Sequence, residues 1–397
     1  MQTILLVYMS LYHLSSYDYS LPDELIAQEP ILPQHNARMC VVSRDSWEIL
    51  TDACFYDLPK FLDPDAVIFF NNSKVLASRI PFEDLTLSVW DHTIQASEWE
   101  LFFLRMHAWN RFESLVRPGK KFPIGARFFL AGMDLEVVDT TDSGRLIQIH
   151  SWDIFEAMNQ YGQLPLPPYI AYQKEKEKEY QTVFASSLGS VAAPTASLHF
   201  TNDLLEKLPN TKEFVTLHVW LGTFKWVQEE DIRDYQIHGE PIEIEKDIFR
   251  RIALYKNASK LLVAVGTTVC RTLESLPFLW ILLSDEDKSL YPMDVQDFWN
   301  RLVEGYSSEF VTSYTANDAS FIFESFLYIT PGKTFFLVDE LITNFHLPRT
   351  SLLILVSAFL WKDETKKVYH HAINEKYRFF SFWDGMYIKK GHRKEAI

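Results

Sequence analysis

The second half of the chain alternates short apolar β runs with helical stretches, and this order restricts the possible folds more than any other feature. The strand-like and helix-like runs follow one another in the order Phe214–Val219, Ile248–Ala258, Lys260–Val265, Thr268–Leu276, Phe335–Val338 and Ser351–Trp361. Such alternation is typical of an α/β core. Val67–Asn71, a short apolar run in the first half, predicts a further buried strand.

A different pattern occupies the segment from about Arg79 to His150. Turn signals such as Gly125 and Gly144 separate short β-rich runs, which are Trp99–Met106, Ala126–Ala131 and Leu135–Asp139. Closely spaced short strands predict a small barrel or sandwich. A short helix is expected next, over Ser151–Tyr161, and Gly162 ends it.

Composition limits the class of protein. The chain has 397 residues, enough for two domains, and its 47% hydrophobic and 15% aromatic content predicts a globular fold. The formal net charge of −15 argues against a broad electrostatic grip on nucleic acid, although 38 Lys and Arg can still build a local basic patch. The apolar N-terminus is shorter than the about 20 residues of a membrane span. It lacks the features of a signal peptide, and the start of the chain is expected at Met1 or Met9.

Two further features predict ordinary structural roles. Cys40, Cys54 and Cys270 show no paired spacing, which indicates buried cysteines in a reducing cytoplasm rather than a disulfide framework or a zinc site. The charged run Lys174–Glu179 predicts a solvated connector or helix face.

Three blocks place Thr, His or Asn beside Gly, Pro or Ala at the end of an apolar run. They are Val191–Thr201, Val215–Phe224 and Thr343–Thr350. Such positions suit polar groups that face a ligand from a rigid frame. Thr201 is also expected to cap the helix that starts near Asn202, but capping does not require Thr195 or His199.

An anion site is one interpretation of Gly266, Thr267 and Thr268, which lie between a strand and a helix. A helix N-terminus offers free N–H groups and a partial positive charge, and Arg271 lies one turn further on. Ordinary capping of the helix is the alternative. The chain contains neither G-x-G-x-x-G nor a Walker A motif, which disfavours a nicotinamide or P-loop nucleotide enzyme.

His218 is the first candidate for proton transfer, since strand periodicity places it between Thr216 and Trp220 on one face. A structural histidine is the alternative. His238 and Glu240 alternate along an extended segment, so the carboxylate can orient the imidazole, and two such residues are weak evidence for a metal.

Two further groups predict ligand contacts. Asn344, His346 and Arg349 occupy a loop before a helix, where they can bind a base edge, ribose hydroxyls or an anion, with Thr350 or Ser351 as the helix cap. A basic patch for RNA is expected in the first half at Arg117, Lys120, Lys121 and Arg127, with the tail residues Lys389, Lys390, Arg393 and Lys394 as additions. Scattered solubilising charge is the alternative.

The three blocks closely resemble the S-adenosylmethionine:tRNA ribosyltransferase-isomerases of queuosine biosynthesis. Further segments match that family in order: Leu21–Pro30, Phe70–Arg79, Val116–Lys121, Leu164–Ile170, Tyr180–Ala185, Val265–Ser275 and Tyr377–Ile388. The resemblance implies an α/β core domain, residues 1–78 and 159–397, with an inserted small β-barrel-like domain at 79–158. Residues 277–321 form an acidic insertion within the core, expected at the surface.

The resemblance also implies a reaction. The ribosyl part of S-adenosylmethionine is transferred to 7-aminomethyl-7-deazaguanine at the tRNA anticodon wobble position and isomerised, which gives epoxyqueuosine, adenine and methionine. His218, His199, His238 and Glu240 are the expected proton-transfer residues. The expected substrate-binding residues are Thr195, Thr223, Thr267, Thr268, Arg271, Asn344, His346 and Arg349. S-adenosylmethionine is a cosubstrate, and neither a cofactor nor a metal is expected. A monomer in the cytoplasm, without a membrane partner, is expected.

Departures from the family pattern leave a second hypothesis open. The family has Gly where this chain has Ser197, Trp220 and Trp383. If Trp220 lies on the face of His218, it either stacks on a ligand ring or fills the pocket. The alternative to a working enzyme is therefore a catalytically weakened paralogue that binds tRNA or a nucleoside ligand without turnover.

Overall fold

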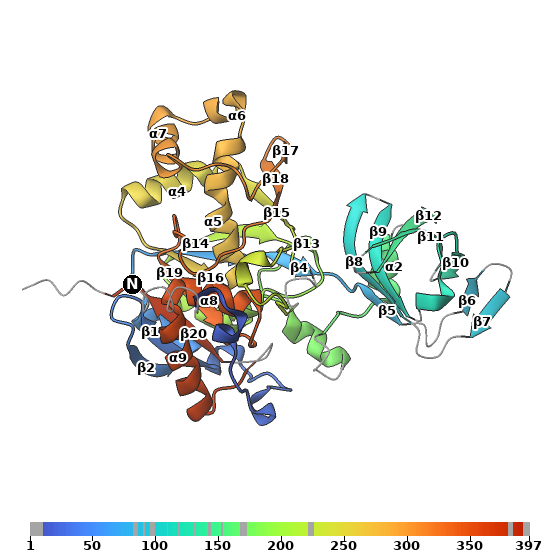
Figure 1. Ribbon diagram of the computed structural model, residues 1–397, viewed down its shortest axis with the longest axis horizontal. Helices are drawn as coiled ribbons and strands as arrows, with labels where there is room; N and C mark the ends of the chain where they lie inside the picture. The colour runs from blue at the N-terminus through green and yellow to red at the C-terminus, as the bar shows by residue number, and fades with distance from the viewer. Residues whose placement is uncertain are drawn as a thin grey trace, which may run out of the picture.

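The computed structural model describes most of the chain between residues 11 and 391. The described ranges are 11–81, 86–89, 92–95, 100–108, 110–117, 119–130, 132–141, 144–151, 154–166, 173–220, 226–379 and 384–391. Two large sheets dominate, one of ten strands and one of eight, and they lie side by side in Figure 1. No helix in these ranges is long and apolar enough to cross a membrane.

The ten-stranded sheet forms the α/β part of the fold. Its order is β17 (Tyr314–Ala316), β18 (Ser320–Ser325), β15 (Glu240–Glu245), β14 (Thr211–Leu217), β3 (Val67–Asn71), β16 (Leu262–Val265), β19 (Glu340–Asn344), β20 (Gly385–Lys389), β1 (Arg38–Ser43) and β2 (Ile49–Cys54). The central strands β14, β3, β16 and β19 are parallel to one another, so all four end at one side of the sheet. We call this side the carboxyl rim; its strand ends are Leu217, Asn71, Val265 and Asn344.

Both faces of the sheet are covered at its centre, which explains why β3 and β16 are buried along their whole length. In β3, Val67 and Phe69 belong to one hydrophobic cluster and Ile68 and Phe70 to another, as strand alternation requires. The first cluster contains side chains of α4 (Ile248–Asn257), α5 (Thr267–Leu282), α8 (Ser351–Leu360) and α9 (Lys362–Asn374). The second contains residues of the short helix α3 (Asn202–Lys207), which Thr201 caps through Leu204 N–H as expected.

The eight-stranded sheet is antiparallel between all neighbouring strands. Its order is β5 (Arg79–Pro81), β8 (Glu100–Ala108), β9 (Arg111–Arg117), β12 (Arg145–Ser151), β11 (Met133–Thr140), β10 (Arg127–Leu130), β6 (Thr86–Val89) and β7 (His92–Gln95). It curls around its own hydrophobic cluster, which includes Phe128 and the helix α2 (Ile154–Tyr161). The chain enters and leaves through adjacent segments, since Arg79 and Gln163 exchange backbone hydrogen bonds of 3.2 and 2.8 Å. The sheet is consistent with the expected barrel-like domain.

The prediction of a strand at Phe335–Val338 is wrong, because the strand in this region begins at Glu340. The buried carboxylate of Glu274 accepts the backbone N–H groups of Phe336, Leu337 and Val338 at 2.7 to 3.0 Å. These donors are therefore used by a side chain from α5, which holds the segment without strand pairing.

The helix expected to end at Leu276 continues through Pro277 to Leu282. Proline removes one backbone donor, but this helix is packed among buried side chains on all sides, and Trp280 is 0% exposed. The start of the acidic insertion is thus the end of a core helix.

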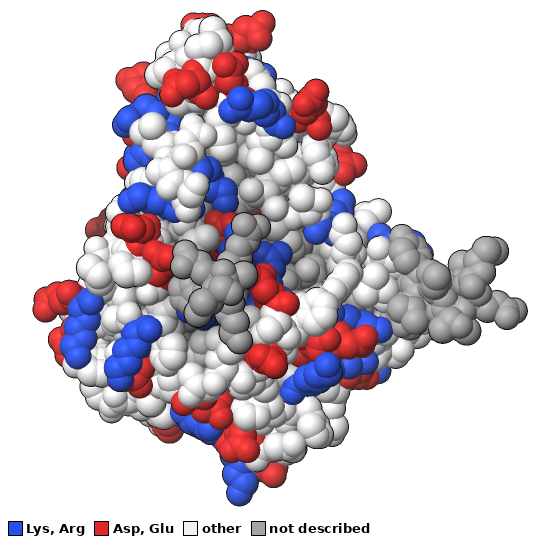
Figure 2. All heavy atoms as spheres, turned by 90° about the vertical axis from the view of Figure 1, so that its left-hand side faces the viewer, with Lys and Arg blue, Asp and Glu red and all other residues white. Residues whose placement is uncertain are grey.

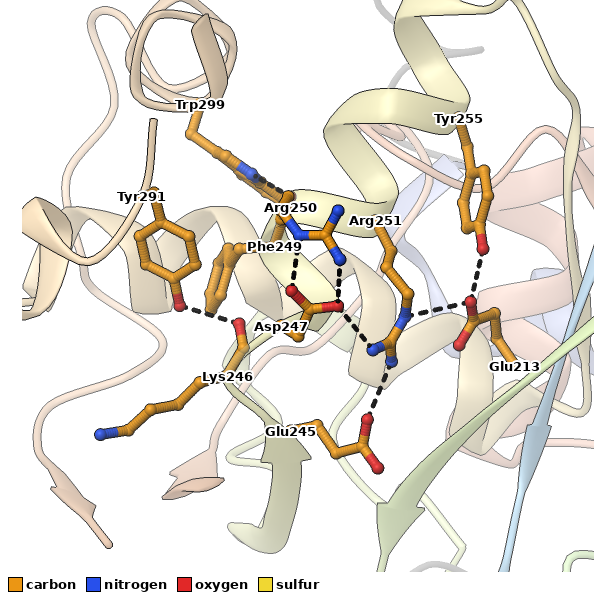
Figure 3. A network of polar contacts seen from close by, with 10 residues as sticks. All are labelled: Glu213, Glu245, Lys246, Asp247, Phe249, Arg250, Arg251, Tyr255, Tyr291 and Trp299. Atoms are coloured by element: carbon orange, nitrogen blue, oxygen red, sulfur yellow. Dashed lines mark hydrogen bonds and ion pairs between the residues drawn. The ribbon is translucent and has the colours of Figure 1, made fainter. Parts of the chain in front are cut away.

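The rest of the acidic insertion is not a purely surface feature either. It forms α6 (Asp285–Ser289) and α7 (Met293–Leu302) above α4. Figure 3 shows how it docks: Trp299 Nε1 donates to Phe249 O at 2.9 Å, and the Tyr291 hydroxyl donates to Lys246 O at 2.8 Å. Trp299 is fully buried. The many acidic residues of the segment predicted a surface position, although its apolar side chains pack against the core.

The charged run Lys174–Glu179 is also more tightly held than expected. It is part of a 3-10 helix, Lys174–Tyr180, in which Lys176 is 5% exposed. The Lys176 ammonium pairs with Glu29 at 2.8 Å. This lysine therefore links the segment to the N-terminal region and does not point into solvent.

Candidate active site

Chain segments that are distant in the sequence meet at the carboxyl rim. His218 follows β14, Gly266 and Thr267 follow β16, and Asn344 ends β19. Because β15 runs antiparallel to β14, its first residue, Glu240, reaches the same side. In open α/β sheets, ligands bind at the carboxyl ends of the parallel strands.

A pocket opens at this rim beside the start of α5. Five residues expected from the sequence are among its lining: His238, Glu240, Thr267, Thr268 and Arg271. Its remaining lining is mostly apolar and comes from Ile237, Leu327, Tyr328, Ile329, Ser351, Leu352 and Leu355. An apolar cleft with a few convergent polar groups is the usual form of a small-molecule site.

Arg271 is anchored rather than free. Its guanidinium donates to Glu240 Oε2 at 2.6 Å, to His238 O at 3.0 Å and to Ser325 O at 2.8 Å. Arg271 and Glu240 are 5% and 1% exposed. Burial lowers the pKa of Arg271, and Glu240 acts in the opposite direction. The pair therefore stiffens the wall of the pocket, and the Arg271 Nε–H has no partner among the described residues.

Unpartnered polar atoms gather at the rim. Of the 14 buried side-chain N and O atoms without a hydrogen-bond partner in the described residues, seven belong to residues of this region: Ser197, His218, His238, Thr268, Arg271, Tyr328 and Asn344. A buried donor or acceptor without a partner costs about 1–3 kcal/mol. So many at one rim indicate a surface that is completed by a polar ligand.

His238 and Thr268 are the clearest examples inside the pocket. The Nε2 atom of His238 lies 3.8 Å from Glu240 Oε1, beyond hydrogen-bond distance. The Thr268 hydroxyl, in the first turn of α5, has no hydrogen-bond partner in the part of the chain that the structure describes. Gly266 precedes this turn with φ 93°, a conformation that favours glycine.

His199 lies at the rim between Phe55 and Asn344. Its ring stacks on Phe55 at 3.9 Å between centroids, and its Nε2 lies 3.2 Å from Asn344 Oδ1. Burial lowers the pKa of His199 to about 4. The imidazole is therefore neutral near pH 7, and the amide Nδ2 of Asn344 still lacks a partner.

His218 packs against the backbone of β13 (Ser187–Ser190). A Cβ atom at Gly189 would lie 2.6 Å from its ring, so only glycine leaves room for this imidazole. Burial lowers the pKa of His218 to about 4, and its Nδ1 is buried without a partner. A neutral imidazole with a free nitrogen can accept a proton.

His346 is held by its own loop. Its Nε2 lies 2.9 Å from the Thr343 hydroxyl, and its backbone N–H donates to the Tyr369 hydroxyl at 2.9 Å. It is 8% exposed, and burial lowers its pKa to about 3. These contacts give His346 a structural explanation that the sequence did not reveal.

The remaining substrate-binding candidates are placed as follows. Thr195 is half-buried at the start of the 3-10 helix Thr195–His199. Arg349, whose side chain is 47% exposed, pairs with Asp18 on the surface. Thr350, not Ser351, caps α8 by accepting from Leu353 N–H. Thr223 and Trp383 lie outside the described residues.

Trp220 is not among the residues that line the pocket. Its half-buried ring lies under the guanidinium of Arg105, whose Cζ is 4.3 Å from the ring centroid. One face of the indole is therefore in contact with a side chain of the eight-stranded sheet.

The four basic residues of the patch expected in the first half, Arg117, Lys120, Lys121 and Arg127, lie on the eight-stranded sheet or its η5 turn (Gly119–Lys121). Arg393 and Lys394 lie outside the described residues. Lys120 and Lys121 are exposed. Arg117 is 71% exposed beside Glu100, and Arg127 forms a two-point pair with Asp134. Lys389, in contrast, is buried and donates to Phe61 O. On the face shown in Figure 2, Lys and Arg are interspersed with Asp and Glu.

Potential metal ligands meet away from the pocket. Cys40, Asp52 and His371 place ligand-type atoms within 4.8 Å of one another. His371 and the Tyr377 hydroxyl already contact the Asp52 carboxylate, and Arg38 stacks on the Tyr377 ring at 3.8 Å. The carboxylate is thus used by protein groups, with a positive charge nearby. Within the described residues, the three cysteines are free, and Cys54 is only partly buried.

Sequence patterns missed two residues of the pocket wall. Tyr328 lines the pocket with a buried hydroxyl that lacks a partner, and Ser325 holds Arg271 through its carbonyl oxygen. The pairing of β18 with β15 places Ser325 opposite Glu240, and Tyr328 follows three residues later. No local signal in the segment marks them.

Comparison with known proteins shows which family this chain resembles. A family model described as queuosine biosynthesis protein matches residues 14–388. The S-adenosylmethionine:tRNA ribosyltransferase-isomerase of Symbiobacterium thermophilum is 38% identical over 382 residues, which cover 94% of this chain and 99% of that protein. The Halothermothrix orenii protein of the same name is 37% identical over 379 residues, covering 94% and 98%. A crystal structure of S-adenosylmethionine tRNA ribosyltransferase from Thermotoga maritima has 26% identity and a TM-score of 0.47, covering 94% of this chain and 99% of that one.

Proposed function

The chain belongs to the S-adenosylmethionine:tRNA ribosyltransferase-isomerases of queuosine biosynthesis, and we propose that its carboxyl rim carries out their reaction. The ribosyl part of S-adenosylmethionine is transferred to 7-aminomethyl-7-deazaguanine at the wobble position of tRNA. Isomerisation then gives epoxyqueuosine, and adenine and methionine leave. The observation that carries the proposal is the group of unpartnered buried polar atoms at the rim.

The chemistry requires a base, an acid and a firm hold on the ribose. The sulfonium charge activates the adjacent carbon, so a neutral imidazole can remove a proton from it. His218 and His199 are the candidates, because burial lowers the pKa of each to about 4 and so keeps the imidazole neutral near pH 7. The same shift makes each a weaker base than a free imidazole. His238, next to Glu240, is the candidate acid for adenine departure.

The start of α5 is the proposed site for the methionyl carboxylate. Its first-turn N–H groups, the Thr268 hydroxyl and the Arg271 Nε–H are donors available to an anion. Thr267 adds a second hydroxyl at the pocket wall. Asn344 and Thr195 are proposed to contact the ribose or a base. Arg349 is proposed to contact the tRNA after leaving Asp18.

The other parts of the proposal concern the partners. Residues 79–158 are proposed as the inserted domain that contacts the tRNA through Arg117, Lys120, Lys121 and Arg127. The reaction needs no resident metal or cofactor, since proton transfer and hydrogen bonding supply its chemistry. We further propose that the protein acts as a monomer in the cytoplasm, where its tRNA substrate is found.

The weakened-paralogue hypothesis came from the glycine losses at Ser197, Trp220 and Trp383 and from the acidic balance, with Trp220 as the residue most able to fill the pocket. Trp220 instead stacks with Arg105 and does not line the pocket, so no observation favours that hypothesis.

The test is incubation with S-adenosylmethionine and tRNA that carries the aminomethyl-deazaguanine base. Adenine release together with epoxyqueuosine in the digested tRNA is the expected result. Binding of both substrates without adenine release would refute the proposal. The same tRNA with unmodified guanine at the wobble position is the matched control.

A further inference from the structure

Arg105 connects the two large sheets at the edge of the proposed active site. It lies on β8, in the eight-stranded sheet, whereas its contacts Trp220 and Glu324 belong to the ten-stranded part. The Arg105 Nη2 atom is 2.7 Å from Glu324 Oε1, and its Cζ is 4.3 Å from the Trp220 ring centroid. One guanidinium thus makes both an ion pair and a cation–π contact across the junction.

We infer that Arg105 is a positioning residue that sets the eight-stranded sheet against the catalytic rim when tRNA is bound. This inference rests on the proposed function. It assigns to Arg105, Trp220 and Glu324 a role in aligning the two substrates, not in the chemical step.

Both contacts of Arg105 adjoin proton-transfer candidates. Trp220 is two residues after His218. The Glu324 side chain packs against Gly239, which lies between His238 and Glu240; a Cβ atom at Gly239 would be 2.5 Å from the Glu324 carboxyl carbon. A displacement of β8 therefore acts both on the segment that carries His218 and on the segment that carries His238.

The other end of β8 lies beside the proposed RNA contacts. Glu100, its first residue, opposes Arg117 in the sheet. At about 3.3 Å a residue, Arg105 is roughly 17 Å from that end. The strand pairs with β9 along its length and with β5 at its start, in an antiparallel sheet with its own core, so it can transmit the position of bound RNA to the rim as a rigid element.

The geometry also explains the tryptophan at position 220. The indole gives the guanidinium a flat partner at a junction where the ion pair alone is about one-third exposed, 32% for Arg105 and 30% for Glu324. An exposed ion pair is weak, and the contact with the aromatic ring additionally fixes the orientation of the guanidinium. Glycine, which the family pattern has here, offers no such contact.

Kinetics of single and exchanged variants test the role. Arg105→Ala and Glu324→Ala are each expected to lower kcat/KM for tRNA at least tenfold, with S-adenosylmethionine affinity in the absence of tRNA changed less than twofold. The exchanged pair, Arg105→Glu with Glu324→Arg, is expected to recover at least a third of the activity. Arg111→Ala is the matched control, because Arg111 pairs with Gln148 within the same sheet and should leave the kinetics unchanged.

A substrate-free measurement separates this inference from the proposed function. Spin labels at Phe129→Cys and Leu254→Cys, both exposed positions, report the distance between the sheets in a Cys54→Ser background. Arg105→Ala is expected to broaden the distance distribution, and Arg111→Ala is not. An unchanged distribution, or tRNA kinetics equal to those of the unsubstituted protein in Arg105→Ala, overturns the inference. Absence of adenine release by the unsubstituted protein would overturn only the proposed function.

Discussion

Arg271 and Glu240 form a buried ion pair 2.6 Å long, although 30 residues separate them in the chain. The pair joins the first turns of α5 to the first residue of β15, and it brings the His238 carbonyl into the same set of hydrogen bonds. This one contact therefore keeps the pocket wall rigid and neutralises the buried charge of Arg271.

Removing one member of this pair is expected to destabilise the fold. Glu240→Gln leaves a buried guanidinium without its counter-charge, and breaking a buried pair costs about 3–5 kcal/mol. Urea unfolding followed by circular dichroism measures the change. Arg233→Ala removes a partly exposed pair with Asp231 and is expected to cost less than about 1 kcal/mol. Equal effects of the two variants would contradict the structural role of the Arg271–Glu240 pair.

His218→Ala is expected to lower kcat by about 10²–10⁴, the usual contribution of a general acid or base. Because the pKa of His218 is lowered to about 4, the imidazole stays unprotonated as the pH falls from 7 to 5. Its protonation should therefore reduce the rate only near pH 4. Turnover of His218→Ala equal to that of the unsubstituted protein would remove His218 from the chemistry.

Gly189→Ala tests the packing of that histidine without altering it. A Cβ atom at this position would lie 2.6 Å from the ring, so the imidazole must move. We expect the rate to fall at least tenfold while the protein stays folded. Gly119→Ala is the control, since its nearest neighbour would be 3.8 Å away. Crystal structures of both variants would show whether only the first one shifts His218.

Acidification is expected to weaken the fold through His199 and His346. Burial lowers the pKa of these side chains to about 4 and about 3 from an ordinary 6.5. The unfolded chain therefore binds protons first, and stability falls as the pH drops from about 6.5 toward these values. His199 alone accounts for roughly 3 kcal/mol at 1.36 kcal/mol for each pKa unit.

One carboxyl acts in the opposite direction. Burial raises the pKa of Glu340 from 4.5 to about 7, so its contribution to stability falls as the pH rises through that interval. The difference between the unsubstituted protein and His199→Phe, measured by urea unfolding from pH 7 to 4.5, isolates the histidine. Parallel curves for the two proteins would refute the histidine's contribution.

The acidic insertion is expected to support the core. Trp299→Ala removes a fully buried indole that also donates to Phe249 O, which should cost about 3–5 kcal/mol. Met293→Ala on the same helix, 68% exposed, should change stability by less than about 0.5 kcal/mol. Thermal unfolding distinguishes the two, and a small effect of Trp299→Ala would show that the insertion is dispensable for folding.

Local patterns were enough for much of the architecture. Apolar runs predicted β3 at Val67–Asn71, and the cap at Thr201 was visible beside the helix that it starts. The three polar blocks fall at strand ends because a chain leaving a buried strand needs residues that can turn, cap and face solvent or ligand. Each of these signals involves residues close together in the sequence.

The failures share one cause. The segment Phe335–Val338 is apolar enough for a strand, but its backbone donors go to Glu274, more than 60 positions earlier. Pro277 suggested a helix end, and packing by distant side chains overrides it. The acidic residues of Asp285–Asp297 predicted a surface segment, although Trp299 is buried against Phe249 of α4.

The sequence by itself determined the family, the α/β alternation and the residue types available for proton transfer and anion binding, because these depend on composition, periodicity and motif order. Only the tertiary structure decided how these residues are used. It pairs Arg271 with Glu240, holds His346 within its loop, leaves Thr268 and His238 without partners, and places Trp220 under Arg105. The physical reason is that strand order in the sheets decides which side chains meet, and no local property of the chain specifies that order.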